Sequence, residues 1–318
     1  MNGVASALQL ARDGQGAAAV AQLQTDGSAG ALTLLALWQI EGKQVPRDTA
    51  TARANLKRAA DLGSAQAARI HAGLLATGIG GPADWPAAVQ ALAASADPLM
   101  QRQHDLIAAM ALDAGGAPLA LPEAEPIAPG LRWHRGLLSP AECSLLASLA
   151  APRLKPARIW HEGQRAWVVD PLRQAHQAGF AVVYEWPFVH AINRRIAAAT
   201  GTDVRRGEPL QVLRYVPGEL YAPHLDAVPG LENQRVTTML IWLNDAFDGG
   251  ETAFDRLGLS LRGQIGDALE FSNVDHAGRP DAKMRHEGRP VTAGQKLLAS
   301  RWIRARASEE YGPQELSG

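Results

Sequence analysis

The first third of the chain repeats itself with a period of 36 residues. The letters GSA at residues 27–29 recur at 63–65, and Gly42, Pro46 and Asp48 have identical residues at 78, 82 and 84. A period of this length is typical of units that each contain one pair of helices. Small residues let the paired helices approach closely, and each pair buries its apolar face only against the next pair. Residues 1–114 are therefore predicted to form an α-helical repeat solenoid.

Residues 115–130 differ in composition from the chain on either side. Their sequence, GGAPLALPEAEPIAPG, contains four prolines and three glycines. Because both residue types oppose regular helix, this segment is predicted to be a linker. Residues 131–318 carry most of the valine, tryptophan and tyrosine of the chain, and they are predicted to form a second domain.

The second domain is predicted to begin with helix and to continue with short strands. Ser139 and Glu142 have the spacing of a capping box before an apolar run, and residues 188–201 have helical spacing that ends at Gly201. Strand-like runs follow at residues 210–216, 235–245, 249–254, 268–273 and 295–304. Many short strands between glycine-rich turns are typical of a jelly roll. The predicted class is α+β, a helical solenoid followed by a jelly roll with flanking helices.

The charge balance and the cysteine content show which kinds of binding site and cross-link are not expected in this protein. The 31 Lys and Arg residues nearly cancel the 32 Asp and Glu residues, so a nucleic-acid-binding surface is not expected. Cys143 is the single cysteine, which excludes an intrachain disulfide and a thiolate metal cluster. The sequence shows neither a signal peptide nor an apolar stretch of membrane-spanning length. We expect a cytoplasmic protein without a membrane partner.

The segment YAPHLDAVPG, residues 221–230, places a histidine and an aspartate two positions apart. Residues two apart on an extended segment project to the same side, so His224 and Asp226 could bind one metal ion while Leu225 points away. Alone, this pair is a weak motif, because it arises often by chance. It also lacks one ligand of the 2-His-1-carboxylate set, which binds Fe(II) and leaves coordination positions open.

The sequence offers two candidates for the missing ligand, His276 and His286. His286 precedes a predicted strand and lies ten residues before Lys296, which could project into the same barrel. His276 lies in a loop beside Asp275, where a solvated or turn-capping histidine is the usual outcome. We therefore favour His286.

The ordered set of HxD, GGET, a distal histidine and a lysine ten residues later resembles the catalytic domain of the prolyl 4-hydroxylases, members of the 2-oxoglutarate- and Fe(II)-dependent oxygenases. The resemblance covers about residues 131–306 and rests on the runs LQVLRYVPGELYAPHLD, NQRVTTMLIWLND and RHEGRPVTAGQKLLASRWIR. It implies Fe(II), 2-oxoglutarate and O2 as cofactors, with ascorbate as a further candidate. The implied reaction is hydroxylation of a peptidyl proline, coupled to oxidative decarboxylation of 2-oxoglutarate to succinate and CO2.

The resemblance also implies roles for nine residues. A lysine inside a barrel needs an anion, which a dicarboxylate supplies. An aromatic wall suits a pyrrolidine ring, and an arginine can hold a peptide carbonyl group. The implied roles are metal ligation by His224, Asp226 and His286, 2-oxoglutarate binding by Lys296, Tyr215 and Thr238, and substrate binding by Tyr221, Arg235 and Trp302. No catalytic side chain beyond the metal centre is implied.

The sequence departs from the family pattern near the expected substrate channel. Val228 stands where many members have an aromatic residue, and the loop from Asp226 to Arg235 is short. Arg173 is a candidate for a family arginine that precedes the helix at 188–201, but the flap that closes over substrate is not assigned.

The repeats and the substrate each leave an alternative open. Residues 10–112 resemble Sel1-like repeats, relatives of the tetratricopeptide repeat, which implies either a docking surface for a protein partner or a passive helical brace. The expected substrate is a protein or peptide that contains proline. The alternatives are the same chemistry on a free amino acid, a small metabolite or another side chain, and a catalytically silent binding protein.

Overall fold

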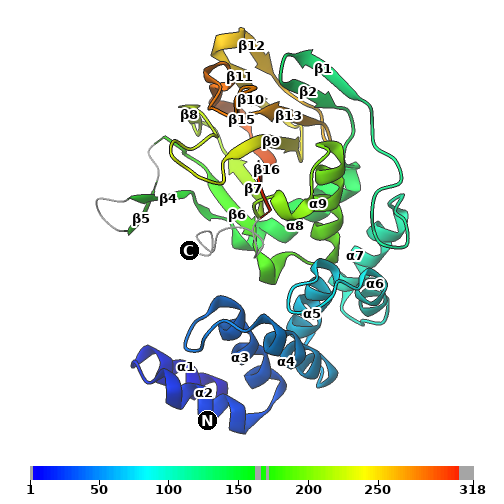
Figure 1. Cartoon of the computed structure of the whole chain (residues 1–318), viewed down its shortest axis with the longest axis vertical. Helices are drawn as coiled ribbons and strands as arrows, with labels where there is room; N and C mark the ends of the chain where they lie inside the picture. Colours follow the sequence, from blue (N-terminus) through cyan, green and yellow to red (C-terminus); the bar gives the residue numbers. More distant parts are fainter. Residues whose placement is uncertain (1–2, 162–165, 170–171, 308–318) are drawn as a thin grey trace. The chain divides into compact units, whose positions relative to one another are not determined.

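The computed structural model of the chain describes residues 3–161, 166–169 and 172–307 (Figure 1). They form two compact units, one made of Met1–Ala117 with Val182–Ile192, the other of Pro118–Ala181 with Asn193–Gly318. No helix within the described ranges is long and apolar enough to cross a membrane.

The first unit is helical, as predicted. Its helices are α1 (Gly3–Arg12), α2 (Gly16–Asp26), α3 (Ala29–Glu41), α4 (Thr49–Asp61), α5 (Ala65–Thr77), α6 (Trp85–Ala93) and α7 (Pro98–Ala109). The 36-residue period is present in the fold: α3 and α5 begin and end 36 residues apart, and α4 and α6 begin 36 residues apart. Equivalent residues also cap these helices, since Ser28 and Ser64 accept N-terminal backbone N–H bonds while Gly42 and Gly78 end the helices in the left-handed conformation.

The core of this unit contains a segment that is distant in sequence. Leu56, Ile70 and Leu74 are among the buried residues of one apolar cluster, and Val182 and Val183 pack against it. These valines belong to a short 3-10 turn at Val182–Tyr184. The compact units are therefore not two uninterrupted stretches of sequence.

The second unit contains two main sheets. An eight-stranded sheet has the order β1-β2-β13-β9-β16-β7-β6-β3, and a four-stranded sheet has the order β12-β11-β14-β8. In chain order their bounds are β1 (Ala124–Ala128), β2 (Leu131–His134), β3 (Lys155–Pro156), β6 (His176–Phe180), β7 (Leu210–Tyr215), β8 (Tyr221–His224), β9 (Arg235–Trp242), β11 (Thr252–Phe254), β12 (Leu259–Leu261), β13 (Ala268–Ser272), β14 (His286–Gly288) and β16 (Lys296–Arg304). Two further pairs join β10 (Phe247–Gly249) to β15 (Val291–Gly294) and β4 (Arg158–His161) to β5 (Ala166–Val169).

One apolar core joins the two main sheets. It contains Trp242, Phe271 and Leu298 from the larger sheet and Phe254 from the smaller one. Residues two apart on a strand share a face, so alternate residues of β7, β9 and β16 enter this core. The jelly roll predicted from the short strands, a double-stranded β-helix, is confirmed.

The predicted elements agree closely with the observed ones, except in the segment 115–130. Ser139 and Glu142 form the predicted capping box at the start of α8 (Pro140–Ala150), and the helix expected at 188–201 is α9 (Pro187–Ala199). Residues 124–128, expected to be linker, instead form β1 and pair with β2. Proline is tolerated on an edge strand because no neighbouring strand needs its missing N–H, and Pro126 occupies this edge position.

Candidate metal centre and its pocket

Strand pairing brings three potential metal ligands together. His224 ends β8, Asp226 follows two residues later, and His286 begins β14 directly opposite His224. One ligand atom from each residue lies within 4.8 Å of those of the other two. His224 Nε2 lies 3.6 Å from Asp226 Oδ1, and His286 Nε2 lies 3.8 Å from Asp226 Oδ2. The structure thus places the ligands favoured from sequence around one point.

Backbone contacts fix which imidazole nitrogen faces this point. His224 Nδ1 lies 2.8 Å from the carbonyl oxygen of Ala222, and His286 Nδ1 lies 3.0 Å from that of Met284. A carbonyl oxygen accepts a hydrogen bond from Nδ1 only when Nδ1 carries the proton, and this tautomer leaves the Nε2 lone pair for a metal. Burial lowers the pKa of His286 to about 4, so this ring is neutral near pH 7. Two neutral imidazoles and one carboxylate fit Fe(II) and leave positions for other ligands.

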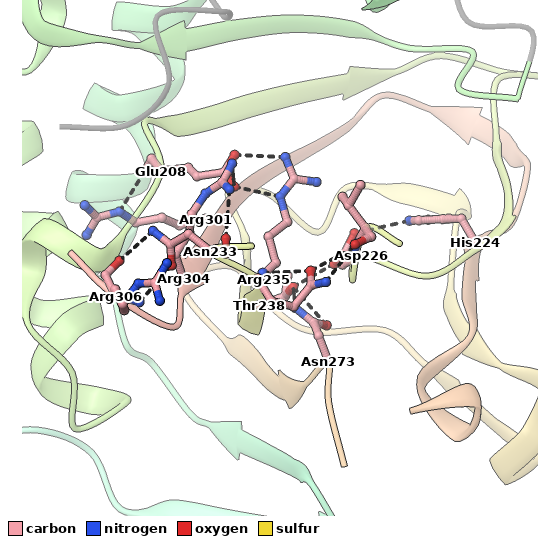
Figure 2. A network of polar contacts seen from close by, with 12 residues as sticks. Glu208, His224, Asp226, Asn233, Arg235, Thr238, Asn273, Arg301, Arg304 and Arg306 are labelled. Carbon is pink, nitrogen blue, oxygen red and sulfur yellow. Dashed lines mark hydrogen bonds and ion pairs between the residues drawn. The ribbon is translucent and has the colours of Figure 1, made fainter. Parts of the chain in front are cut away.

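Thr238 forms a hydrogen bond with the carboxylate of Asp226. The Thr238 hydroxyl donates to Asp226 Oδ2 at 2.6 Å, and Asn273 Nδ2 donates to the same hydroxyl at 2.9 Å (Figure 2). Burial alone would raise the pKa of Asp226, but His286, His224 and Thr238 together hold it well below its ordinary value. The sequence led us to expect Thr238 in the 2-oxoglutarate pocket. It does not line that pocket, because its side chain is committed to the metal-ligating carboxylate.

Replacing Thr238 by valine is expected to weaken metal binding by roughly 10- to 100-fold, the usual cost of losing an outer hydrogen-bond partner of a ligand. Valine keeps the shape but removes the donor, and it also leaves Asn273 without this acceptor. Anaerobic titration of the metal-free protein with Fe(II) measures the change. Thr238→Ser, which restores the hydroxyl, should bind Fe(II) nearly as the wild type does; equal affinity in the valine variant would contradict the role.

Aromatic rings fix the two histidines in place. The ring of Tyr221 stacks on that of His224 with centroids 3.5 Å apart, and Phe254 and Phe271 pack against His286 with centroids at 5.4 and 4.7 Å. Tyr221 also lines the pocket. The position proposed for it on the substrate side is therefore directly beside a metal ligand.

A pocket extends from the metal ligands to Lys296. Alternate residues of β16 line one wall, and residues of β7 and β8 line others; these are Lys296, Leu298, Ser300, Trp302, Leu213, Tyr215 and Tyr221. Lys296 lies opposite Tyr215 in the β16–β7 pairing, and both side chains are buried. This alternation places the lysine expected to bind 2-oxoglutarate in the same cavity as the metal ligands.

Lys296 has no carboxylate partner among the described residues. Its ammonium group donates to the carbonyl oxygen of Gly250 at 2.6 Å, and burial lowers its pKa to about 8 against the opposing charge of Glu251. An ammonium group has three donors and a full charge, so one carbonyl leaves room for an anion. A dicarboxylate that ligates the metal at one end would satisfy it at the other.

The GGET segment shapes this end of the pocket. Gly249 and Gly250 have φ values of 68° and 66°, which L side chains rarely adopt. A Cβ atom on Gly250 would lie 3.2 Å from Lys296 Cδ. The paired glycines therefore allow the Gly250 carbonyl to meet the lysine, a structural role that agrees with the turn expected here.

Arg235, predicted to bind substrate, is paired with a carboxylate. Its Nε and one terminal nitrogen donate to the two oxygens of buried Glu208 at 2.7 and 2.9 Å (Figure 2). The guanidinium lies 3.8 Å from the centroid of the Trp302 ring, and it does not line the pocket, whereas Trp302 does. Arg235 thus supports Trp302 from outside the pocket.

Two further residues are prominent here: Glu208, for which the sequence predicted no role, and Arg173, which the sequence offered only as a candidate for a family arginine. Glu208 also pairs with Arg304, at 2.8 Å, so a single buried carboxylate organises two arginines. Arg173 lines the pocket, where it faces Tyr221 and Trp302. The contacts of both residues come from segments that are distant in sequence, so the packing of strands reveals them.

Comparisons with known proteins agree with this site. The family model described as the 2OG-Fe(II) oxygenase superfamily matches residues 210–304. Prolyl 4-hydroxylase subunit alpha-1 of Rattus norvegicus is 32% identical over 196 residues, 59% of this chain and 36% of that protein. Prolyl 4-hydroxylase 1 of Arabidopsis thaliana is 31% identical over 208 residues, 59% of this chain and 73% of that protein. The chain thus spans about a third of the rat subunit.

Two solved structures are also similar. The viral collagen prolyl hydroxylase of Paramecium Bursaria Chlorella virus-1, in its 2OG complex, is 25% identical with a TM-score of 0.46, covering 56% of this chain and 97% of that one. A Pseudomonas putida prolyl-4-hydroxylase is 19% identical with a TM-score of 0.40, covering 56% of this chain and 94% of that one.

Proposed function

This chain belongs to the prolyl 4-hydroxylase-like 2-oxoglutarate- and Fe(II)-dependent oxygenases, and from that premise we propose that it hydroxylates a proline residue within a protein or peptide. The observation that carries the proposal is the placement of Tyr221 and Trp302 in the pocket that holds the metal ligands. Flat aromatic rings provide apolar walls for a pyrrolidine ring. The named relatives are prolyl 4-hydroxylases, which supports the same substrate class here.

Each part of the site has a defined task in this reaction. Bound Fe(II), together with 2-oxoglutarate and O2, supplies oxidation of a C–H bond to C–OH while 2-oxoglutarate becomes succinate and CO2. His224, Asp226 and His286 would hold the metal, and the buried ammonium group of Lys296, which lines the same pocket, would bind the far carboxylate of 2-oxoglutarate. Leu213, Leu240 and Leu298 line the pocket with apolar surface, which limits water around the reacting groups.

The substrate ring is positioned by Tyr221 and Trp302. Tyr221 stacks on His224, one of the three potential metal ligands, and the guanidinium of Arg235 lies against the ring of Trp302. A reacting C–H bond must be held close to the metal, because misplacement by about 1 Å can cost about 100-fold in rate. The two rings would supply this positioning without acting as acid or base.

The helical unit is proposed to be a Sel1-like repeat domain. The 36-residue spacing of α3 and α5, together with their equivalent serine and glycine caps, supports this. Stacked repeats commonly present an extended surface to another protein, so recruitment of a protein substrate or partner is part of the proposal. A cytoplasmic location, expected from the sequence, is part of it as well.

The proposed reaction is tested by incubating the full chain with Fe(II), 2-oxoglutarate, ascorbate and a pool of proline-containing peptides. We expect succinate, and we expect mass spectrometry to find one added oxygen atom on proline. Tyr221→Ala should lose most of this product, because the proline ring loses one wall, whereas Tyr184→Ala removes an exposed tyrosine outside the pocket and should not. Succinate formation without any hydroxylated proline would reject the substrate and retain the oxygenase.

A further inference from the structure

The carboxylate of Asp226 ends a hydrogen-bonded chain of three buried side chains. Asn273 Nδ2 donates to the Thr238 hydroxyl at 2.9 Å, and this hydroxyl donates to Asp226 Oδ2 at 2.6 Å (Figure 2). Asn273 is 2% exposed, and Thr238 is fully buried. Because burial keeps water from these groups, each polar atom depends on its protein partner. Asn273 is the outermost member of the chain, two hydrogen bonds away from the carboxylate.

The chemistry of the three groups fixes the direction of both hydrogen bonds. An ionised carboxylate only accepts, so the single proton of the Thr238 hydroxyl points to Asp226. The hydroxyl then has only lone pairs left, and the amide of Asn273 has to donate to it. The distances agree, since Asn273 Nδ2 lies 2.9 Å from the hydroxyl oxygen and Oδ1 lies farther away, at 3.3 Å. Asn273 thus commits the hydroxyl proton to the metal-ligating carboxylate.

The backbone holds Asn273 in place beside Thr238. Asn273 directly follows β13, in which Phe271 pairs with Thr238. Its N–H donates to the carbonyl oxygen of Val236 at 2.8 Å, and its own carbonyl oxygen accepts from the N–H of Asp281 at 3.1 Å. The amide side chain therefore starts from a fixed backbone position, and it can fix the hydroxyl of Thr238 in turn.

The orientation of the Asp226 carboxylate depends on its contacts. The last torsion of an aspartate side chain is only weakly restricted by its own geometry, so neighbouring groups decide how its oxygens point. His224 Nε2 and His286 Nε2 lie 3.6 and 3.8 Å from these oxygens, but both histidines are themselves potential metal ligands. Thr238 is not one of the three ligands and does not line the pocket. Its hydrogen bond can therefore orient the carboxylate both with and without a metal.

We propose that Asn273 is a positioning residue of the metal centre, which directs the Thr238 proton to Asp226 and so fixes the orientation in which this carboxylate binds Fe(II). Accepting a hydrogen bond also makes the hydroxyl a stronger donor, because hydrogen bonds in series polarise one another. Asn273 does not line the pocket, so its effect on the metal passes through Thr238. The inference rests on the metal centre of the proposed function and does not depend on proline as the substrate.

The test is a double-mutant cycle on Fe(II) affinity, measured by anaerobic titration of the metal-free full chain. Asn273→Leu keeps a similar shape without the donor, and we expect it to weaken Fe(II) binding roughly 3- to 10-fold, less than the roughly 10- to 100-fold expected for Thr238→Val. The double variant should bind Fe(II) no more weakly than Thr238→Val alone, because partners in one network are not additive. Two losses that multiply would show that Asn273 acts independently of Thr238, and they would overturn the inference.

The visible absorption spectrum of the protein loaded with Co(II) separates positioning from stability. A reoriented carboxylate changes the ligand field of the bound ion, so Asn273→Leu should shift this spectrum. Asn273→Ala removes the same donor without the bulk of leucine and should give the same shift, so it tests the inference if the leucine variant does not fold. A lower melting temperature of the metal-free variants, with wild-type Co(II) spectra and Fe(II) affinities, would overturn the inference in favour of a purely structural role.

Ser272→Ala is the matched control, because Ser272 adjoins Asn273 and its hydroxyl donates to the carbonyl oxygen of Val274. Its Fe(II) affinity and Co(II) spectrum should equal those of wild type, and a change as large as that of Asn273→Leu would contradict the proposed role. A wild-type protein that binds no Fe(II) would reject the proposed function and this inference together. If wild type binds Fe(II) but hydroxylates no proline, only the proposed substrate fails, and the same cycle decides the role of Asn273.

Discussion

Asp226→Ala is expected to abolish 2-oxoglutarate turnover and to weaken Fe(II) binding by more than the roughly 100-fold that loss of an outer partner costs. Asp226 is the only carboxylate of the three clustered ligands, so its loss removes the negative charge that offsets the metal. It is also buried, and it accepts the Thr238 hydroxyl. The variant would thus lose a ligand and leave a buried donor without its acceptor.

The measurement combines anaerobic Fe(II) titration with succinate formation. Asp248→Ala is a suitable control, because the Asp248 side chain is 75% exposed and forms only a 3.8 Å pair with Arg262. We expect this control to match wild type in both assays. Asp226→Glu keeps the charge but moves the carboxylate by one methylene, so it should bind metal better than Asp226→Ala while turning over poorly. Wild-type Fe(II) affinity in Asp226→Ala would exclude the triad as the metal site.

Periodic patterns in the sequence predicted the architecture well, because they record burial directly. The repeat of small residues predicted helix pairs with a period of 36 residues, and α3 and α5 do begin and end 36 residues apart. Apolar runs predicted β7, β9, β13 and β16 with bounds that differ by at most three residues from the observed ones. The metal ligands and Lys296 were also identifiable, since their spacing along the chain follows from strand pairing. His286 begins its strand opposite His224, and Lys296 begins the strand that pairs with Tyr215.

The sequence predicted less well the direction in which side chains point and the residues with which they form hydrogen bonds. Thr238 and Arg235 lie on one strand, β9, yet Thr238 is occupied by Asp226 and Arg235 by Glu208. Such partners come from distant segments, so sequence spacing contains no signal for them. For the same reason, the sequence predicted neither the place of Arg173 in the pocket, which depends on a bridge to Tyr221, nor the packing of residues 182 and 183 into the helical unit.

Lys296→Met is expected to raise the KM for 2-oxoglutarate by roughly 10- to 100-fold, the range for loss of a hydrogen bond to a charged group. The ammonium group is buried and has no carboxylate partner among the described residues, so the anion would be its main counterpart. Lys155→Met, at an exposed lysine in β3, controls for loss of charge elsewhere. Equal KM values for Lys296→Met and wild type would exclude Lys296 from the 2-oxoglutarate site.

The pH dependence of the KM for 2-oxoglutarate tests more directly whether the charge of Lys296 binds this ligand. Burial lowers the pKa of Lys296 to about 8 in the ligand-free protein, so the group is charged below that pH and becomes neutral above it. A dianionic ligand favours the charged form, and the KM for 2-oxoglutarate should therefore stay low below pH 8 and rise by up to about tenfold per pH unit above it. Lys296→Arg keeps its charge throughout this range, so its KM should not show the rise. A wild-type KM that is flat across pH 8, or an equal rise in Lys296→Arg, would assign the binding of the far carboxylate to another group.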